Sequence, residues 1–140
     1  MAIARPYTSI IERLRHVGLR PTRQRKELGR LLFDGPDRHV TAESLHDEAA
    51  RAGIQVSLAT VYNTLNQFTE AGLMREIVVD GDRAYFDTNT SDHHHFFHTD
   101  TGALEDIDGH AVSIGNLPAA PSGTTVERVD VIVRVSGAQR

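Results

Sequence analysis

The 140-residue sequence contains no cysteine, no tryptophan and no long apolar run. Without cysteine, the chain can form no disulfide, thiol redox centre, cysteine nucleophile or thiolate zinc site. Its apolar runs are only a few residues long, whereas a membrane-spanning helix needs about 20. The start of the sequence shows neither an apolar signal core nor a small-residue cleavage site. We therefore expect a cytoplasmic protein with no membrane partner, whose metal chemistry depends on histidine and carboxylate side chains.

The formal net charge of −4 is the sum of two unlike parts. Residues 1–30 carry eight Lys or Arg and two Glu, a net charge of +6, so the rest of the chain carries −10. Such asymmetry suggests that one end of the chain meets a polyanion. The histidines are also unevenly distributed, since five of the eight lie between residues 93 and 110. Nucleic acid at one end and metal at the other are the partners that this composition favours.

Capping residues and apolar spacing predict four helices in the first half of the chain, over about 8–18, 22–33, 41–52 and 57–72. Thr22, Thr41 and Ser57 are the expected caps of the last three. In the fourth helix Val61, Leu65 and Phe68 follow the i, i+4, i+7 pattern of a buried face.

From residue 73 the pattern changes to that of strands, with a hairpin signal around Asp80-Gly81-Asp82. Helices followed by a hairpin predict a winged helix over residues 1–87. A polar stretch, residues 88–92, is a candidate hinge to a second domain over 93–140. Short strands are predicted there at 93–97, 103–107 and 129–135, so the expected fold class is α+β.

A helix that enters the DNA major groove needs short polar side chains near its start and cationic side chains close to phosphates. The fourth predicted helix offers Ser57, Thr60, Tyr62 and Asn63, and the basic segment offers Arg13, Arg15, Arg20, Arg23 and Arg25. Asn63 could pair with adenine, the Tyr62 ring could pack on a thymine methyl, and Arg20 could enter a narrow minor groove. In the alternative interpretation, Ser57 is only a helix cap and the polar face is only solvated. The succession of basic helix, polar helix and hairpin favours DNA binding.

Five stretches of the chain together resemble the ferric uptake regulator family of bacterial metal-responsive repressors. They are GLRPTRQR (18–25), HVTAE (39–43), SLATVYNTLNQF (57–68), YFDTNTSDHHHFF (85–97) and VDVIVRV (129–135). The resemblance is greatest to the iron response regulator branch of this family. It implies an N-terminal winged-helix DNA-binding domain, a short C-terminal α/β dimerisation domain, and a homodimer on a palindromic double-stranded DNA operator. It also implies that Tyr62 approaches thymines and that Arg20 serves the minor groove, whereas many relatives carry Arg in place of Asn63.

His93 and His95 lie two residues apart on a predicted strand, so both side chains can face one ion while His94 points away. With carboxylates they would form a mixed nitrogen and oxygen site suited to iron, manganese or zinc. The family resemblance implies an inter-domain site that also contains His39, Asp87 and Asp106, where Asp106 replaces a glutamate of the family. The structural zinc of the family uses paired Cys-x-x-Cys motifs, so we expect none here.

In the iron response regulator branch, haem is thought to act as effector together with metal or instead of it, through the cluster matching His93, His94 and His95. Imidazole is a common ligand of haem iron. A Cys-Pro haem motif, present in some members, is absent. The alternative is that three adjacent histidines form a solvated turn, but the neighbouring carboxylates and phenylalanines favour ligation.

The sequence therefore predicts a dimeric transcription regulator that responds to iron status through haem, a divalent metal or both. A zinc- or peroxide-sensing repressor of the same broad family is the first alternative. A metal-dependent hydrolase is the second, but the sequence has no His-Glu-x-x-His or Gly-x-Ser-x-Gly motif, and we expect no enzyme activity.

Overall fold

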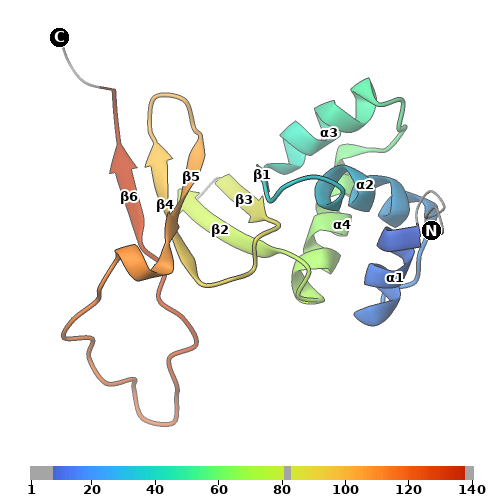
Figure 1. The fold of residues 1–140 in the computed structure, drawn as a ribbon. Helices are drawn as coiled ribbons and strands as arrows, with labels where there is room; N and C mark the ends of the chain where they lie inside the picture. The colour runs from blue at the N-terminus through green and yellow to red at the C-terminus, as the bar shows by residue number, and fades with distance from the viewer. Residues whose placement is uncertain (1–7, 81–82, 138–140) are drawn as a thin grey trace, which may run out of the picture. The chain divides into compact units, whose positions relative to one another are not determined.

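A computed structural model describes residues 8–80 and 83–137, which form two compact units, one ending at Thr90 and the other beginning at Ser91. The first unit contains, in chain order, α1 (Thr8–His16), α2 (Arg23–Phe33), β1 (His39–Val40), α3 (Ala42–Arg51), α4 (Leu58–Glu70), β2 (Arg75–Asp80) and β3 (Arg83–Asp87) (Figure 1). The second contains β4 (His93–His98), β5 (Leu104–Asp108), the 3-10 helix η1 (Gly109–Ala111) and β6 (Ile132–Val135). No helix in the described ranges is long and apolar enough to cross a membrane. The mixed α+β class predicted from the sequence is confirmed.

The three predicted helix caps are present in the structure. The hydroxyl of Thr22 accepts the backbone N–H of Arg25 at the start of α2. Thr41 and Ser44 exchange hydrogen bonds of 3.0 Å in a reciprocal capping box that starts α3. Each such cap contributes about 1 kcal/mol to helix stability, which explains why hydroxyl residues predicted these helix starts so well.

The core of the first unit forms where the apolar faces of the helices meet the sheet. Val61, Leu65 and Phe68 of α4 are fully buried, as the spacing predicted. The other members of the buried apolar cluster are Ile10, Leu14, Leu28, Leu32, Val40, Ala42, Leu45, Ala49, Met74 and Phe86. Burying one such large apolar side chain stabilises the fold by about 1.5–3 kcal/mol. The core therefore holds α4 firmly on one face and leaves its opposite face to solvent.

The sheet of the first unit has the strand order β1-β3-β2, and both pairs of neighbours are antiparallel. The predicted hairpin is confirmed as β2 and β3, although Gly81 and Asp82 of its turn lie outside the described residues. The sequence did not predict β1, which is only two residues long. Its register places His39 opposite Asp87.

The sheet of the second unit has the order β5-β4-β6, with β4 antiparallel to β5 and parallel to β6. A parallel pair requires a crossover connection. Here residues 109–131 make that connection, and among the described residues of this unit they include η1 but no α-helix. Pro118 and Pro121, with nearby glycines, disfavour a longer helix in this stretch.

The last strand is shorter than predicted. The alternation of valines indicated residues 129–135, whereas β6 begins at Ile132. Its pairing with β4 begins opposite His95, and the backbone N–H of Val131 just before it donates to the His94 ring. Val133 on this strand is 37% exposed.

Candidate DNA-binding surface and metal ligands

The start of α4 carries the four residues that the sequence proposed for base recognition. Ser57 is the N-cap: its hydroxyl accepts the backbone N–H of Thr60 at 3.1 Å and donates to the Thr60 hydroxyl at 2.9 Å. The capping role considered for Ser57 as an alternative is therefore present. Tyr62 and Asn63 lie on the exposed face of the helix. A rigid, capped helix with an exposed polar face has the form that major-groove recognition requires.

The hydroxyl of Tyr62 donates a 2.8 Å hydrogen bond to the carboxylate of Glu43 in α3. This bond lowers the pKa of Glu43 and raises the pKa of Tyr62, because it stabilises the anionic carboxylate and the protonated phenol. The sequence does not point to Glu43, because 19 positions separate the two residues and no periodicity joins them.

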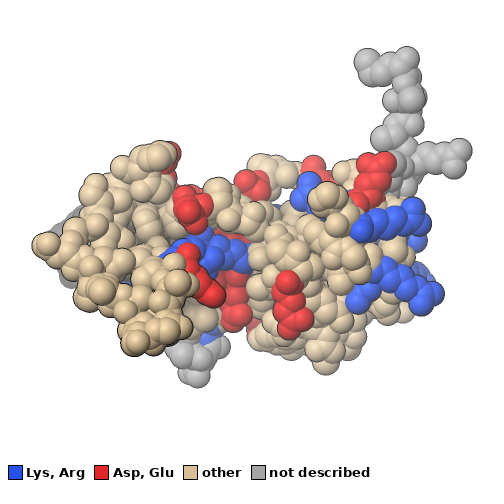
Figure 2. Space-filling model, turned by 90° about the horizontal axis from the view of Figure 1, so that it is seen from below, with Lys and Arg blue, Asp and Glu red and all other residues tan. Residues whose placement is uncertain are grey.

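The exposed residues of α1 and α2 include Arg13, Arg15, Arg23 and Arg30, and Figure 2 shows basic and acidic side chains close together on one face of the molecule. Some of the arginines expected to contact phosphate already interact with other side chains of the protein. Arg13 lies over the ring of Phe33, with the guanidinium carbon 4.8 Å from the ring centre, and Arg23 pairs with Glu27 at 3.0 Å. Arg15 and Arg20 are exposed, whereas Arg5 lies outside the described residues. Exposed pairs such as Arg23–Glu27 are weak, so phosphate can compete for their cations.

Arg25 has a structural role that the sequence did not reveal. Its Nε donates to the side-chain oxygen of Gln67 in α4 at 3.1 Å, and its Nη1 donates to the carbonyl oxygen of Arg20 at 2.9 Å. One guanidinium group thus ties the connector that carries Arg20 to the helix that carries Tyr62.

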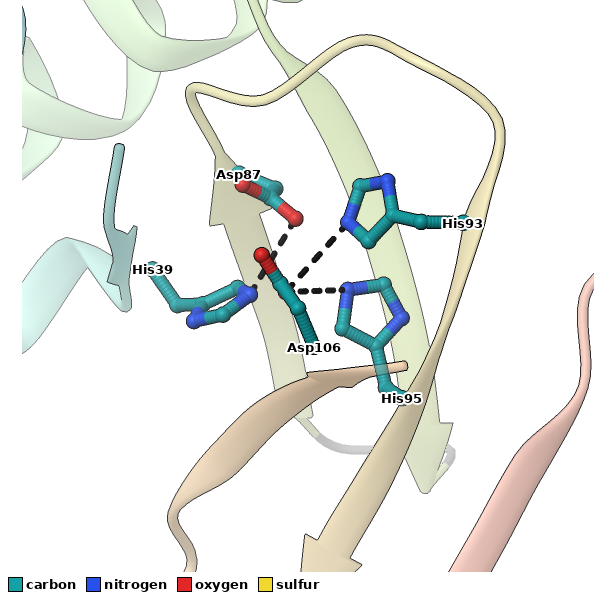
Figure 3. A group of neighbouring side chains, drawn as sticks. All are labelled: His39, Asp87, His93, His95 and Asp106. Atoms are coloured by element: carbon teal, nitrogen blue, oxygen red, sulfur yellow. Dashed lines mark ion pairs between the residues drawn. The ribbon is translucent and has the colours of Figure 1, made fainter. Parts of the chain in front are cut away.

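His39 and Asp87 form the first group of predicted metal ligands. The Nε2 atom of His39 lies 3.1 Å from Oδ2 of Asp87, and the Asp87 side chain is completely buried. Figure 3 shows the two side chains pointing toward each other from β1 and β3. The other carboxylate oxygen of Asp87 accepts the backbone N–H of Asn89 at 2.8 Å.

A third side chain lies in line with His39 and Asp87 across the sheet. Arg75 of β2 lies directly opposite Asp87 of β3, and directly opposed residues of antiparallel strands project from the same face. Arg75 is only 5% exposed. The sheet therefore presents a row of imidazole, carboxylate and guanidinium in which the buried carboxylate is central. The sequence does not point to Arg75, because its place opposite Asp87 depends on strand register.

His93, His95 and Asp106 form the second group of ligands, on β4 and β5. The Nε2 atoms of His93 and His95 lie 3.3 Å and 3.4 Å from Oδ1 of Asp106. Figure 3 shows both rings directed at this carboxylate. The Nδ1 atom of His93 lies 2.6 Å from the carbonyl oxygen of Ser91, so its N–H can donate there and leave the Nε2 lone pair available for a metal.

His94 takes no part in this group, as the strand alternation predicted. Its Nδ1 accepts the backbone N–H of Val131 at 3.0 Å, just before β6 begins. The backbone N–H of His95 donates to the carbonyl oxygen of the same Val131 at 3.2 Å. His94 therefore helps to hold the approach to the last strand. All three histidines of the cluster are buried, so they do not form a solvated turn.

The spacing within each group suits a divalent metal ion. Ligand atoms that are each about 2.1 Å from one ion lie about 3.0–3.4 Å apart at octahedral or tetrahedral angles. The pairs above lie 3.1–3.4 Å apart. Imidazole nitrogens with carboxylate oxygens are suitable donors for iron, manganese and zinc. Each group therefore has the donor chemistry of a metal site, although neither supplies a complete set of ligands by itself.

Comparison with known proteins gives a consistent result. The model of the ferric uptake regulator family matches residues 16–132. The ferric uptake regulation protein of Pseudomonas aeruginosa is 40% identical over 92 residues, which cover 65% of this chain and 69% of that protein. The homologue from Shigella flexneri is 37% identical over 82 residues, which cover 59% of this chain and 55% of its own length.

One solved structure shares both the fold and appreciable sequence identity. The Pseudomonas aeruginosa ferric uptake regulator, determined with manganese, superimposes with a TM-score of 0.71 at 28% identity. The match covers 93% of this chain and 98% of that structure. The similarity therefore extends over both compact units, beyond the region aligned in sequence.

Proposed function

This chain belongs to the ferric uptake regulator family of metal-responsive transcription regulators, and from that premise we propose that it acts in the cytoplasm as a homodimer on palindromic double-stranded DNA. In this proposal residues 1–87 form the DNA-binding domain, 88–92 the hinge and 93–140 the dimerisation and sensing domain. The observation that carries it is the arrangement on α4, where Tyr62 and Asn63 are exposed on a helix that the Arg25–Gln67 hydrogen bond joins to the arginine-bearing α2.

The proposed contacts with DNA divide into two kinds. Base edges in the major groove are read by the α4 face, which carries Ser57, Thr60, Tyr62 and Asn63. Ser57 contributes chiefly by capping the helix, because both hydrogen-bonding functions of its hydroxyl are used within the first turn. Asn63 has the geometry to pair with adenine, and Arg20 enters the minor groove from the connector that Arg25 holds.

We propose that His39, Asp87, His93, His95 and Asp106 bind one divalent ion. The argument is one of donor number: two ligands come before the hinge and three come after it, and a single ion of four to six coordination sites accommodates them together. Bound metal would supply a cross-link between the two units. The residues contribute by presenting Nε2 atoms and carboxylate oxygens from ordered strands, with the His93 ring oriented by Ser91.

The same arrangement suggests how metal status controls DNA binding. When ligands on both sides of the hinge share one ion, the metal-bound state restricts the angle between the units. A dimer reads two half-sites whose separation depends on that angle. Metal therefore shifts operator affinity by favouring the conformation in which both α4 helices fit the DNA.

We further propose that the chain belongs to the iron response regulator branch and responds to haem through His93, His94 and His95. Support comes from the sequence stretches 85–97 and 129–135 and from the concentration of three imidazoles on β4. A change at His94 can distinguish haem binding from metal binding. Its Nδ1 accepts a hydrogen bond from Val131, and its ring is not part of the proposed metal-ligand group around Asp106. His94→Ala should abolish the haem absorbance change but retain divalent-metal binding, with a melting curve recorded to confirm folding. Unchanged haem spectra in this variant would remove His94 from the proposed haem ligands, and unchanged spectra when His93, His94 and His95 are all replaced by alanine would remove haem from the proposal.

The proposed function is tested by titration of operator binding against iron, manganese, zinc and haem. The probe is an A/T-rich palindromic duplex selected by the protein from random-sequence DNA. We expect tighter, salt-sensitive binding to this duplex than to scrambled DNA, with an affinity that changes on addition of iron, manganese or haem. A response to zinc alone would favour a zinc sensor, and loss of binding on peroxide treatment of the iron form would favour a peroxide sensor. Absence of sequence-specific binding under every condition would contradict a regulatory role.

A further inference from the structure

The first unit contains a hollow between α4, the helix proposed to read the bases, and the β2–β3 hairpin, which we call the wing. Its volume is about 470 Å³, and its walls come from the start of α3, from α4 and from β3. The residues that line it are Thr41, Glu43, Tyr62, Arg83, Ala84 and Tyr85. Among the described residues that line it, the carboxylate is that of Glu43, which accepts a hydrogen bond from the Tyr62 hydroxyl.

Glu43 is held on a rigid element. It is the second residue of α3, in the turn that the reciprocal bonds of Thr41 and Ser44 fix. A carboxylate in the first turn of a helix is also stabilised by the helix dipole. Tyr62 is 37% exposed. The bond to Glu43 therefore restricts a phenol that the core does not enclose.

The bond is of the strong, charge-assisted kind. An O–H donor that meets a carboxylate at 2.8 Å forms a shorter and stronger bond than two neutral groups do. The lowered pKa of Glu43 and the raised pKa of Tyr62 have the same cause. At neutral pH the donor is thus the phenol and the acceptor is the ionised carboxylate.

We propose that Glu43 is a positioning residue for DNA recognition, which holds the Tyr62 hydroxyl so that the ring, rather than the hydroxyl, is presented to the bases. This inference rests on the proposed DNA-binding function and adds a second residue, Glu43, that sets how the Tyr62 ring meets thymine. A ring whose hydroxyl proton is already donated reads the apolar feature of the major groove, the thymine methyl group. It also accounts for a carboxylate next to a surface that binds polyanions, where charge alone would disfavour it. Arg83 of β3 lines the same hollow.

The test uses two versions of the selected palindromic duplex that differ at one thymine of one half-site, which is deoxyuracil in the second version and so lacks only the methyl group. Binding constants are measured for wild type, Glu43→Ala, Glu43→Gln and Asp47→Ala. Glutamine keeps an oxygen that can accept the Tyr62 hydroxyl but removes the charge. Asp47 is an exposed acidic residue of the same helix, so its variant controls for the lost charge.

Wild type should bind the thymine duplex about fourfold more tightly than the uracil duplex, the value of one buried methyl group. Glu43→Ala should reduce this ratio to near one, whereas Glu43→Gln and Asp47→Ala should retain it. Tyr62→Phe should behave like Glu43→Ala, and combining both changes should reduce the ratio no further, because the two residues act through one bond.

The possible results distinguish a failure of the Glu43 positioning role from a failure of the proposed DNA-binding function. If wild type binds its palindrome specifically but Glu43→Ala keeps the fourfold ratio, the positioning role is wrong. A ratio lost equally in Glu43→Gln and Glu43→Ala would assign the effect to charge and would also overturn the proposal. Wild type that shows no preference for any palindrome would refute the proposed function itself.

Discussion

The Nε2 atom of His39 lies 3.1 Å from Oδ2 of Asp87, across the register pair that joins β1 to β3. The two-residue strand β1 is held there by its flanks as well. The backbone N–H of Arg38 donates to the Thr88 hydroxyl at 2.9 Å, and the backbone N–H of Thr88 donates to the Arg38 carbonyl oxygen at 3.0 Å. A proposed metal ligand thus owes its position to a very short strand whose pairing with β3 is reinforced by the adjacent residues Arg38 and Thr88.

Replacement of Asp87 should weaken divalent-metal binding strongly. Asp87→Asn keeps the shape and the acceptor for the Asn89 N–H but exchanges an anionic ligand for a neutral amide oxygen. We expect the dissociation constant for manganese to rise about tenfold to a hundredfold, since even an outer residue of a metal site typically contributes that much. Isothermal titration calorimetry measures it. His110→Ala, which removes an exposed imidazole outside both ligand groups, serves as control, and an unchanged constant in Asp87→Asn would exclude Asp87 as a ligand.

The pair formed by Arg38 and Glu48 should make stability depend on pH. Two parallel bonds of 2.9 Å and 2.7 Å join them, and the bond to Arg38 lowers the pKa of Glu48. A carboxyl group with a lowered folded-state pKa adds stability above its unfolded value of about 4.3, and loses it as pH falls through the folded value.

Glu48→Gln should therefore cost about 1 kcal/mol at pH 7, the magnitude of a partly exposed pair with good geometry. The difference from wild type should shrink as pH falls below about 4. Urea unfolding at several pH values measures both effects, with Glu12→Gln on exposed α1 as control. A difference that stays constant down to pH 3 would contradict the assignment.

Arg20 and Arg25 should affect DNA binding in different ways. Arg20→Ala removes one cation and should lower the slope of log affinity against log salt by about one. Arg25→Lys keeps the charge but lacks the fork that reaches both Gln67 and the Arg20 carbonyl. It should weaken operator binding about threefold to tenfold with little change in slope, as expected for a lost hydrogen bond. Fluorescence anisotropy at four salt concentrations distinguishes the two, and equal slope changes in both variants would contradict the structural role of Arg25.

Gly109 should tolerate no side chain. A Cβ atom there would lie 2.7 Å from the backbone carbonyl oxygen of Asp92, at the start of β4. Because backbone must move to accommodate it, Gly109→Ala should destabilise the second unit by about 1–3 kcal/mol. Hydrogen exchange of β4 (His93–His98) measures the loss. Gly115→Ala, where no atom lies within 4 Å, is the matched control, and equal protection in the two variants would refute the prediction.

Local chemistry made the helical half of the fold predictable. A cap hydroxyl, an apolar spacing and a terminating turn are all features within one short segment, and the structure confirms them for α2, α3 and α4. Gly72, with a φ of +86°, ends α4 as expected, since a left-handed residue there favours glycine.

The contacts that position the candidate site could not be predicted in the same way. Arg25 meets Gln67 across 42 positions, and Arg75 lies opposite Asp87 only because β2 and β3 pair in one register. Alternation overestimated the last strand, because its length is decided by a partner more than 30 positions away. The sequence shows directly which chemical groups are present. It does not show how distant segments pair, and these contacts depend on that pairing.

The parallel pairing of β6 with β4 also determines the order in which the second unit can assemble. β4 and β5 can form a hairpin as soon as both exist, but the other edge of β4 finds its partner only after Val135 has been synthesised. Closing so long a connection is slow because its entropy must be lost before any strand contact compensates for it. During that interval the histidine-bearing strand presents unpaired backbone groups to any neighbouring chain, so newly made protein is most prone to mispairing at the strand that carries its proposed sensor.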